Sequence, residues 1–266
     1  MNPILSAVLV VTVIGVIGAI VLVAASVVMH VPVDERVEQI NAVLAGVNCG
    51  ACGYAGCSDY ARAVVEGGAP VDKCTPGGSA CAAAVAAIMG VEAGETGCVK
   101  AVVACSGDCE HTPKRFEYQG LSRCAAVKGL YGGDGACTHG CLGYGDCAAV
   151  CPFGAIAVER GIARVDRSKC VGCGLCVGAC PNDVIRLVPE HRRKPVVLCS
   201  SKDKGADTRK VCSAGCIGCM KCTKVCAKDA IVMDGSLAVI DQTRCVGCQL
   251  CLKECPVGII RIPGVD

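Results

Sequence analysis

The spacing of cysteines constrains this chain more than any other feature of its sequence. Of its 266 residues, 27 are cysteines, and most stand only two or three residues apart. Disulfide bonds do not explain this pattern, because thiols so close in sequence are too crowded for independent bridges and their number is odd. The chain is also far longer than the small secreted domains that depend on disulfides. We therefore expect metal-binding thiolates in a reducing compartment.

A repeat organises the C-terminal half of the chain. Eight cysteines beginning at Cys137 each have a counterpart 75 positions later, beginning at Cys212, and no gap is needed. Between the cysteine groups of each copy, apolar residues alternate around a turn, at Arg160-Gly161 in one copy and Asp234-Gly235 in the other. This pattern predicts two β-hairpins, at Ala155–Val165 and Ala230–Ile240.

Each copy contains a Cys-x₂-Cys-x₂-Cys-x₃-Cys-Pro run, starting at Cys170 and at Cys245. This is the bacterial ferredoxin spacing, in which three close thiolates bind one [4Fe–4S] cluster and the cysteine before proline reaches the partner cluster. Zinc is a less favoured alternative, since such twin runs make poor zinc sites. The four expected ligand groups are Cys137, Cys141, Cys147 and Cys180; Cys151, Cys170, Cys173 and Cys176; Cys216, Cys219, Cys222 and Cys255; and Cys226, Cys245, Cys248 and Cys251.

The two copies differ at one expected ligand. The first copy has Tyr144 where the second has Cys219, so Cys137 is expected to serve in the first copy and its counterpart Cys212 becomes surplus. A sixth cluster held by four of the remaining cysteines stays an open alternative, because their spacing matches no established pattern; these four are Cys98, Cys105, Cys109 and Cys124. The other cysteines without an assigned role are Cys81, Cys199 and Cys212.

A separate group of four cysteines lies nearer the N-terminus. Cys49-x₂-Cys52-x₄-Cys57 comes directly before a helical pattern at Ser58–Glu66, and Cys74 follows after a turn. Cys57 is therefore expected at a helix N-terminus, where backbone amides stabilise thiolate charge. The spacing alone fits either zinc or an iron–sulfur cluster.

The N-terminal segment has the character of a membrane anchor. Ile4–Met29 contains no charged residue, and as a helix it measures about 39 Å against about 30 Å of bilayer hydrocarbon. A cleaved signal peptide is less favoured, because no basic residue precedes the stretch and the stretch is too long. Asp34–Ala45 then predicts an amphipathic spacer helix capped by Asp34. We expect a single pass through the cell (inner) membrane, with the cysteine-rich part on the cytoplasmic side.

The four-Cys segment Asn48–Cys57 resembles the domain that binds one [4Fe–4S] cluster in B subunits of the Rnf ion-translocating electron transport complex. The order of anchor, four-Cys domain, connecting segment and doubled ferredoxin-like module resembles longer members of that family over nearly the whole chain. The resemblance implies electron transfer from reduced ferredoxin, through about five [4Fe–4S] clusters, to other membrane and peripheral subunits. In bacteria such complexes usually couple this transfer to NAD⁺ reduction and to Na⁺ or H⁺ export.

Other functions are disfavoured by what the sequence lacks. The net charge of +2 gives no basic footprint for nucleic acid. No Gly-rich dinucleotide loop and no nucleophile–base pair is recognisable, so we expect no catalytic residues on this chain. One helix without ionisable residues is not an ion path, and partner subunits would pump the ion. An iron–sulfur subunit of another membrane oxidoreductase, such as a hydrogenase, is the alternative.

These observations together predict an α+β protein with one transmembrane helix, a small four-Cys domain and two tandem 2[4Fe–4S] ferredoxin-like modules. The expected boundaries are a transmembrane anchor at 1–30, an amphipathic linker helix at 31–48, the four-Cys domain at 49–90, a connecting segment at 91–136, module 1 at 137–188, a linker at 189–211 and module 2 at 212–266.

Overall fold

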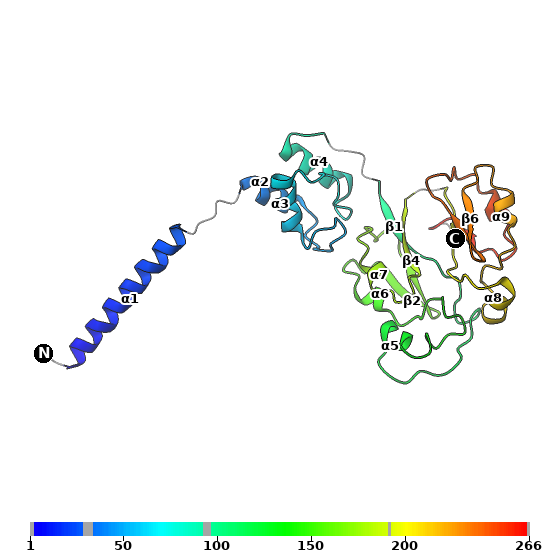
Figure 1. The fold of residues 1–266 in the computed structure, drawn as a ribbon, viewed down its shortest axis with the longest axis horizontal. Helices are drawn as coiled ribbons and strands as arrows, with labels where there is room; N and C mark the ends of the chain where they lie inside the picture. The colour runs from blue at the N-terminus through cyan, green and yellow to red at the C-terminus, as the bar shows by residue number, and fades with distance from the viewer. Residues whose placement is uncertain (1–2, 29–33, 93–96, 191–192, 265–266) are drawn as a thin grey trace.

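The computed structural model describes residues 3–28, 34–92, 97–190 and 193–264; in the first helix, side chains are described for Leu9 and residues 11–26. That helix, α1, spans Pro3–Val28, close to the predicted Ile4–Met29, whose last residue lies outside the described part (Figure 1). Counting only the residues whose side chains the structure describes, which in α1 are Leu9 and 11–26, no helix has both the length and the apolar character needed to cross a membrane.

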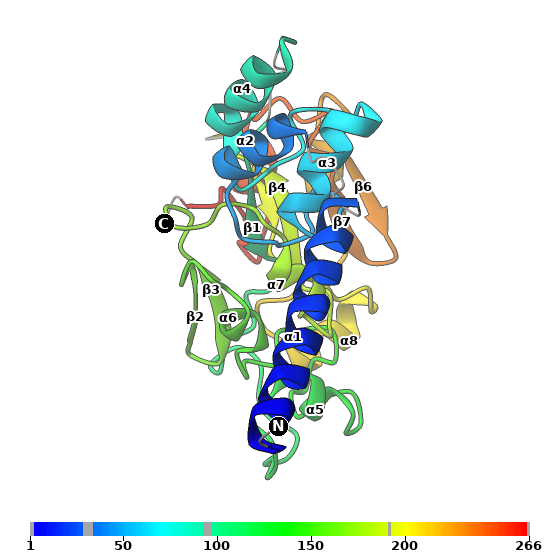
Figure 2. The same cartoon turned by 90° about the vertical axis from the view of Figure 1, so that its left-hand side faces the viewer.

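Three helices form the four-Cys unit: α2 (Glu35–Val43), α3 (Cys57–Gly67) and α4 (Gly78–Met89). Asp34 caps α2 as predicted, and its carboxylate accepts a hydrogen bond from the Arg36 backbone amide at 2.9 Å. α2 packs against both α3 and α4, and its Val37 and Ile40 are buried with Tyr60 of α3. The helix expected as a spacer therefore supplies part of the core of this unit (Figure 2).

Two modules with the same order of elements follow. The first contains α6 (Asp146–Ala149), the hairpin of β2 (Ile156–Glu159) and β3 (Ile162–Val165), α7 (Leu175–Gly178) and β4 (Ile185–Pro189). The second contains α9 (Lys221–Lys224), the hairpin of β6 (Ile231–Asp234) and β7 (Leu237–Ile240), α10 (Leu250–Glu254) and β8 (Ile260–Arg261). Both predicted hairpins are present, although the loop of the second is Gly235-Ser236, one residue later than predicted.

Each module also has a strand from the segment before it, which the repeat did not reveal. β1 (Val99–Val103) pairs antiparallel with β4, and β5 (Val196–Val197) pairs antiparallel with β8. Two short helices, α5 (Cys124–Lys128) and α8 (Gly205–Val211), complete the chain, and Figure 1 shows β1 and β4 side by side. The segments expected as connectors at 91–136 and 189–211 therefore contribute structure to the modules.

The interiors of the two modules are made of small aliphatic side chains and sulfur. In the first, Ile156, Ile162 and Ile185 are buried together with cysteines such as Cys147 and Cys176. The second has the corresponding set, including Ile231 and Leu237 with Cys222 and Cys251. The buried members of both sets include no aromatic residue, so little of the usual aromatic surface stabilises these modules.

One glycine in each module allows the cysteine loop to approach the segment before that module closely. Gly172 lies between Cys170 and Cys173 with φ +71°, and a Cβ placed on it would lie 2.2 Å from the Val99 carbonyl oxygen of β1. Its counterpart Gly247 has φ +72°, and a Cβ there would lie 3.0 Å from Cβ of Arg193. A side chain at either position would meet both an unfavourable backbone conformation and a neighbouring segment.

Gly172→Ala should therefore lower the melting temperature of the protein by about 4–10 °C, because strain and a backbone clash together cost a few kcal/mol. Thermal unfolding followed by circular dichroism measures the change. Gly178→Ala in α7 is the matched control, since its added Cβ meets nothing within 4 Å and its φ is not positive. Equal melting temperatures for the two variants would contradict the packing argument.

Candidate metal centres

The N-terminal cysteine group surrounds one pocket. Cys49, Cys52, Cys57 and Cys74 all line it, as does the ring of Tyr60 from the core. Cys57 is the first residue of α3, and its backbone amide donates to Asn48 Oδ1 at 2.8 Å, which closes the loop around the pocket. The sequence-predicted set of four is therefore brought together.

A fifth thiol lies beside this group. Burial raises the pKa of Cys81 to about 12, and the nearby Cys74 thiol adds to the increase. Cys81 lies on the buried face of α4, where cysteine commonly serves as a small apolar residue.

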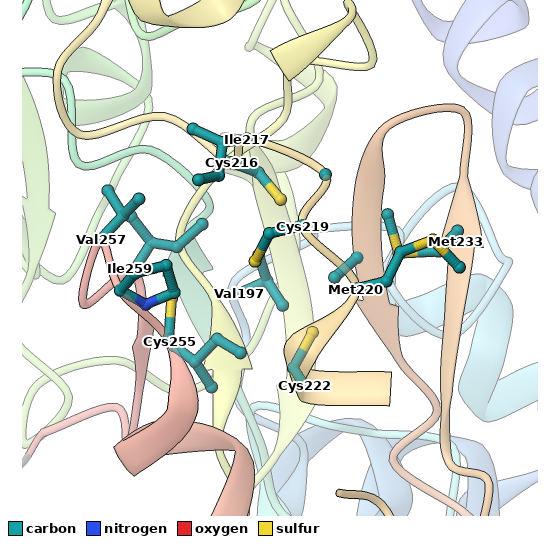
Figure 3. A pocket seen from close by; sticks show the side chains of 14 residues that line it. Val197, Cys216, Ile217, Cys219, Met220, Cys222, Met233, Cys255, Val257 and Ile259 are labelled. Atoms are coloured by element: carbon teal, nitrogen blue, oxygen red, sulfur yellow. The ribbon is translucent and has the colours of Figure 1, made fainter. Parts of the chain in front are cut away.

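The first group of the second module is shown in Figure 3. Cys216, Cys219, Cys222 and Cys255 line one pocket, which is otherwise apolar and includes Val197 and Ile259. Burial raises the pKa of the Cys222 thiol to about 11, and its three companions contribute. Four thiols from two separated stretches of chain therefore face the same space, as the cysteine spacing predicts.

The remaining predicted groups also converge. Burial, followed by the thiols of Cys170, Cys173 and Cys151, raises the pKa of Cys176 to about 11. Burial likewise raises the pKa of the Cys251 thiol to about 11, with contributions from the thiols of Cys245, Cys222, Cys248 and Cys226. Since these neighbours raise the pKa, the uncharged thiols of the metal-free chain must lose protons when metal binds.

The first group of module 1 differs from the predicted set. The pocket that Cys141, Cys147 and Cys180 line has Cys124 as its fourth cysteine, and Cys137 is not among its lining residues. The prediction of Cys137 followed from the absence of a cysteine at Tyr144. A cysteine from another loop, Cys124, lines this pocket instead, which spacing within the repeat did not reveal.

Asp146 explains how Cys124 reaches this position. Its Oδ2 accepts a hydrogen bond of 3.1 Å from the Ala125 backbone amide, at the start of α5. Its Oδ1 lies 3.5 Å from Arg123 Nε. Because Asp146 is the first residue of α6 and Cys147 is the second, these contacts fix Cys124 beside Cys147.

Backbone amides point at several of the sulfur atoms. Cys151 Sγ accepts from the Ala155 amide at 3.4 Å, and the repeat counterpart Cys226 Sγ accepts from the Ala230 amide at 3.3 Å. Cys170 Sγ accepts from the Ala101 amide of β1 at 3.4 Å. Such donors stabilise thiolate charge and tune iron–sulfur clusters, so the donor chemistry fits [4Fe–4S] groups at these sites.

Two negative observations complete the description of the sites. In the described ranges, no group of three or more His, Cys, Asp or Glu side chains is placed to hold a metal ion directly. The open alternative of a sixth site from Cys98, Cys105, Cys109 and Cys124 is not supported, because Cys98 and Cys109 are exposed while Cys105 and Cys124 line different pockets.

Three family models match separate parts of the chain. The Fe-S cluster family (FeS) covers residues 44–76, a 4Fe-4S binding domain covers 163–186, and a 4Fe-4S dicluster domain covers 215–259. Together with the thiol groups described above, these matches define a protein that carries several [4Fe–4S] clusters.

Similar proteins identify the family. The chain is 46% identical over 91% of its length to the B subunit of the Na⁺-translocating ferredoxin:NAD⁺ oxidoreductase complex of Acetobacterium woodii, covering 72% of that protein. It is 42% identical to the proton-translocating counterpart of Clostridium ljungdahlii, over 91% of this chain and 86% of that one. It is 38% identical to the B subunit of the ion-translocating oxidoreductase complex of Methanosarcina acetivorans, over 85% of both. The chain belongs to the family of Rnf complex B subunits.

Cys124→Ala should reduce the iron content of the anaerobically purified protein by at least one and up to about four atoms per chain, because one cluster loses a ligand. Elemental analysis with protein quantitation checks this. Cys98→Ala is the control, since Cys98 is exposed and outside every group above. Full iron content in Cys124→Ala would show that Cys124 is not a ligand.

Proposed function

We propose that this chain is the electron-input subunit of a membrane-bound, ion-translocating oxidoreductase. It takes electrons from reduced ferredoxin and relays them to partner membrane and peripheral subunits. The observation that carries the proposal is the set of thiol groups that follow one another along the chain, from the four-Cys unit to module 2. When bound, [4Fe–4S] clusters supply one-electron carriers at these positions.

The proposed ligands form five groups. Four follow the spacing of the sequence, and Cys124 takes the place of Cys137 in the fifth. The groups are Cys49, Cys52, Cys57 and Cys74; Cys151, Cys170, Cys173 and Cys176; Cys124, Cys141, Cys147 and Cys180; Cys216, Cys219, Cys222 and Cys255; and Cys226, Cys245, Cys248 and Cys251.

Within each module, the short helices carry ligands of two different groups, and this keeps the two groups close. Cys147 and Cys151 lie four residues apart at α6 yet belong to different groups, and so do Cys176 and Cys180 at α7. Each short helix therefore ties two groups together. The four-Cys unit also approaches module 1, because the Cys49 thiol is among the neighbours that add to burial in raising the pKa of the Cys173 thiol.

The exposed end of the path lies in module 2. Cys219 and Cys248 are exposed there, and the exposed lysines Lys221 and Lys224 on α9 lie close in sequence to Cys219. Positive charge beside an accessible group favours rapid encounter with a donor that has a negatively charged face. We place ferredoxin docking here and electron exit at the four-Cys unit.

Mixing the anaerobic, oxidised protein with dithionite-free reduced ferredoxin should bleach its broad visible absorption, and Lys221→Glu combined with Lys224→Glu should slow this at least tenfold at low salt. Stopped-flow absorbance measures the rate. Arg209→Glu combined with Lys210→Glu on α8 is the charge-matched control and should leave the rate within about twofold. No bleaching by ferredoxin, or zinc in place of iron, would refute the function; equal rates for both variants would refute only the docking face.

The same proposal gives α1 the role of a single-pass anchor with the cysteine-rich part on the cytoplasmic side. Support comes from its 26-residue length and from the lack of charge in residues 4–29. A helix of that length measures about 39 Å, enough for a bilayer core of about 30 Å.

Deleting residues 1–33 should move the chain from the membrane fraction to the supernatant, because the apolar segment is removed. Immunoblotting after a carbonate wash shows the distribution. Deletion of the C-terminal residues 265–266 is the control and should leave the chain in the membrane fraction. A full-length chain that the carbonate wash releases would rule out the anchor.

A further inference from the structure

Four cysteines that have no place in the five groups meet between the two modules. Cys105, Cys137, Cys199 and Cys212 line a single pocket, together with Thr112 and Thr208. Cys105 follows β1 and Cys199 follows β5, whereas Cys137 comes shortly before Cys141 and Cys212 shortly before Cys216. Each module therefore contributes two of the four thiols.

The two halves of this pocket are equivalent. Cys105 lies in a Val-x-Cys-Ser sequence that starts at Val103, and Cys199 lies in the same sequence starting at Val197. Cys137 and Cys212 are repeat counterparts, each four residues before the next cysteine. The shared local sequences indicate that both modules present their two thiols in the same way.

Hydrogen bonding repeats this equivalence. The Cys141 backbone amide donates to Cys105 Sγ at 3.4 Å, and its counterpart, the Cys216 amide, donates to Cys199 Sγ at 3.3 Å. The residues just before Cys105 and Cys199 also make equivalent backbone hydrogen bonds. The Ala104 amide donates to the Val184 carbonyl at 2.6 Å, and the Leu198 amide donates to the Ile259 carbonyl at 2.8 Å.

The sulfur atoms are close together and the space around them is narrow. A Cβ on Gly140 would lie 3.6 Å from Sγ of both Cys105 and Cys137, and a Cβ on Gly107 would lie 3.1 Å from Cys212 Sγ. Gly107, two residues after Cys105, therefore lies against Cys212 of the other module.

A buried polar atom faces this site without a partner. Within the described part of the chain, the hydroxyl oxygen of Thr112 makes no hydrogen bond, although it is buried. A buried hydroxyl left unpaired costs about 1–3 kcal/mol, so an acceptor in the pocket would satisfy it. Thiolate or inorganic sulfide is an acceptor of this kind.

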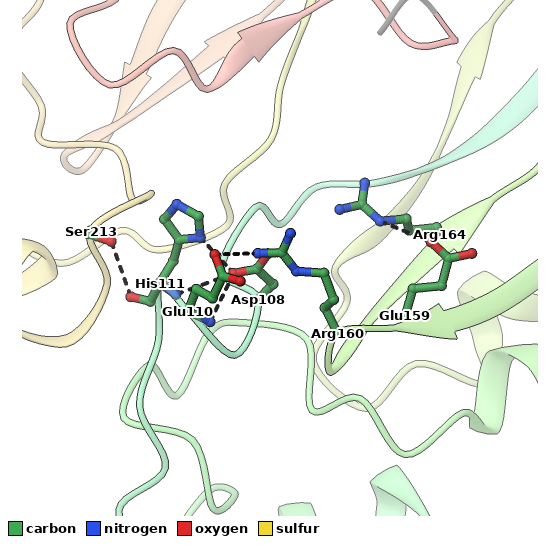
Figure 4. Close-up of polar contacts among 7 residues, drawn as sticks. All are labelled: Asp108, Glu110, His111, Glu159, Arg160, Arg164 and Ser213. Atoms are coloured by element: carbon green, nitrogen blue, oxygen red, sulfur yellow. Dashed lines mark hydrogen bonds and ion pairs between the residues drawn. The ribbon is translucent and has the colours of Figure 1, made fainter.

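The wall that carries Thr112 is anchored to both modules (Figure 4). Arg160, in the β2–β3 turn, lies 2.9 Å from Asp108 and 2.6 Å from Glu110. On the other side, the carbonyl of His111 accepts a hydrogen bond of 3.0 Å from the backbone amide of Ser213, next to Cys212. The Ser213 hydroxyl donates to the same carbonyl at 3.5 Å, as Figure 4 shows. These contacts hold the loop between Cys105 and Thr112 in place.

We propose that Cys105, Cys137, Cys199 and Cys212 bind a sixth [4Fe–4S] cluster at the junction of the two modules. Four thiolates are the ligands that such a cluster requires, and the amide and hydroxyl donors would stabilise its negative charge. The inference rests on the proposed function for the identity of the metal group.

The position of this site makes it a relay between the modules. Cys141 and Cys216 each belong to a neighbouring group, and each donates its amide to a ligand of the sixth site. With clusters bound, an electron leaving the Cys216 group would reach the Cys141 group through this site, so the first would be oxidised as the second is reduced. Without the relay, the two modules would exchange electrons over a longer gap.

The test uses the full-length, anaerobically purified protein. Wild type should contain about 24 irons per chain, and the double variant Cys199→Ala/Cys212→Ala about 20, with the spectroscopic signals of the other five clusters retained. Cys98→Ala/Cys109→Ala is the control, since both residues are exposed, and it should match wild type. After reduction by ferredoxin, electron arrival in module 1 of the Cys199→Ala/Cys212→Ala variant should slow at least tenfold.

Thr112→Val keeps the test valid if the double variant does not fold. This variant should retain all the iron and shift the redox potential of one cluster only, measured by titration with electron paramagnetic resonance. Four results would each overturn the sixth site while leaving the other five: about 20 irons in wild type, unchanged iron in the double variant, one zinc per chain at this site, or a disulfide among the four cysteines. Iron far below 20 in wild type would instead defeat the proposed function.

Discussion

Sulfur takes the place of the aromatic core in this protein. The buried sets of the two modules combine Ile, Val, Leu and Ala with cysteines such as Cys147 and Cys222, and the whole chain contains no Trp and two Phe. Small aliphatic side chains bury too little area to order such short strands alone. The modules therefore depend on cysteines from distant segments being held together, and metal binding supplies that restraint.

The burial that protects these sites also sets their chemistry. It raises the pKa of Cys147 and Cys105 to about 12, so their thiols are neutral until metal displaces the proton. Backbone amides such as those of Ala155 and Ala230 then stabilise the negative charge that remains. Binding of the clusters is coupled to the release of protons from the thiols, and folding of the modules is coupled to that binding.

The sequence predicted what lies within one repeat and failed where distant segments meet. Spacing identified the Cys216 group and both hairpins, because those features are set by neighbours in the chain. Cys124 could not be placed by spacing, since the contacts of Asp146 that bring it to Cys147 are tertiary. The repeat offset of 75 residues even relates Cys124 to Cys199, yet the two line different pockets. The repeated Val-x-Cys-Ser sequence was the available signal for Cys105 and Cys199.

The two equivalent halves at the module junction have a consequence for how such a chain arises. A single copy would contribute only two of these thiols, which are half of what a cubane needs. Two unlinked copies would have to find each other at cellular concentrations, whereas a tether of a few residues holds the partner at an effective concentration of the order of millimolar. Fusing the two copies therefore converts a site between two molecules, which would dissociate on dilution, into an intramolecular site of one polypeptide.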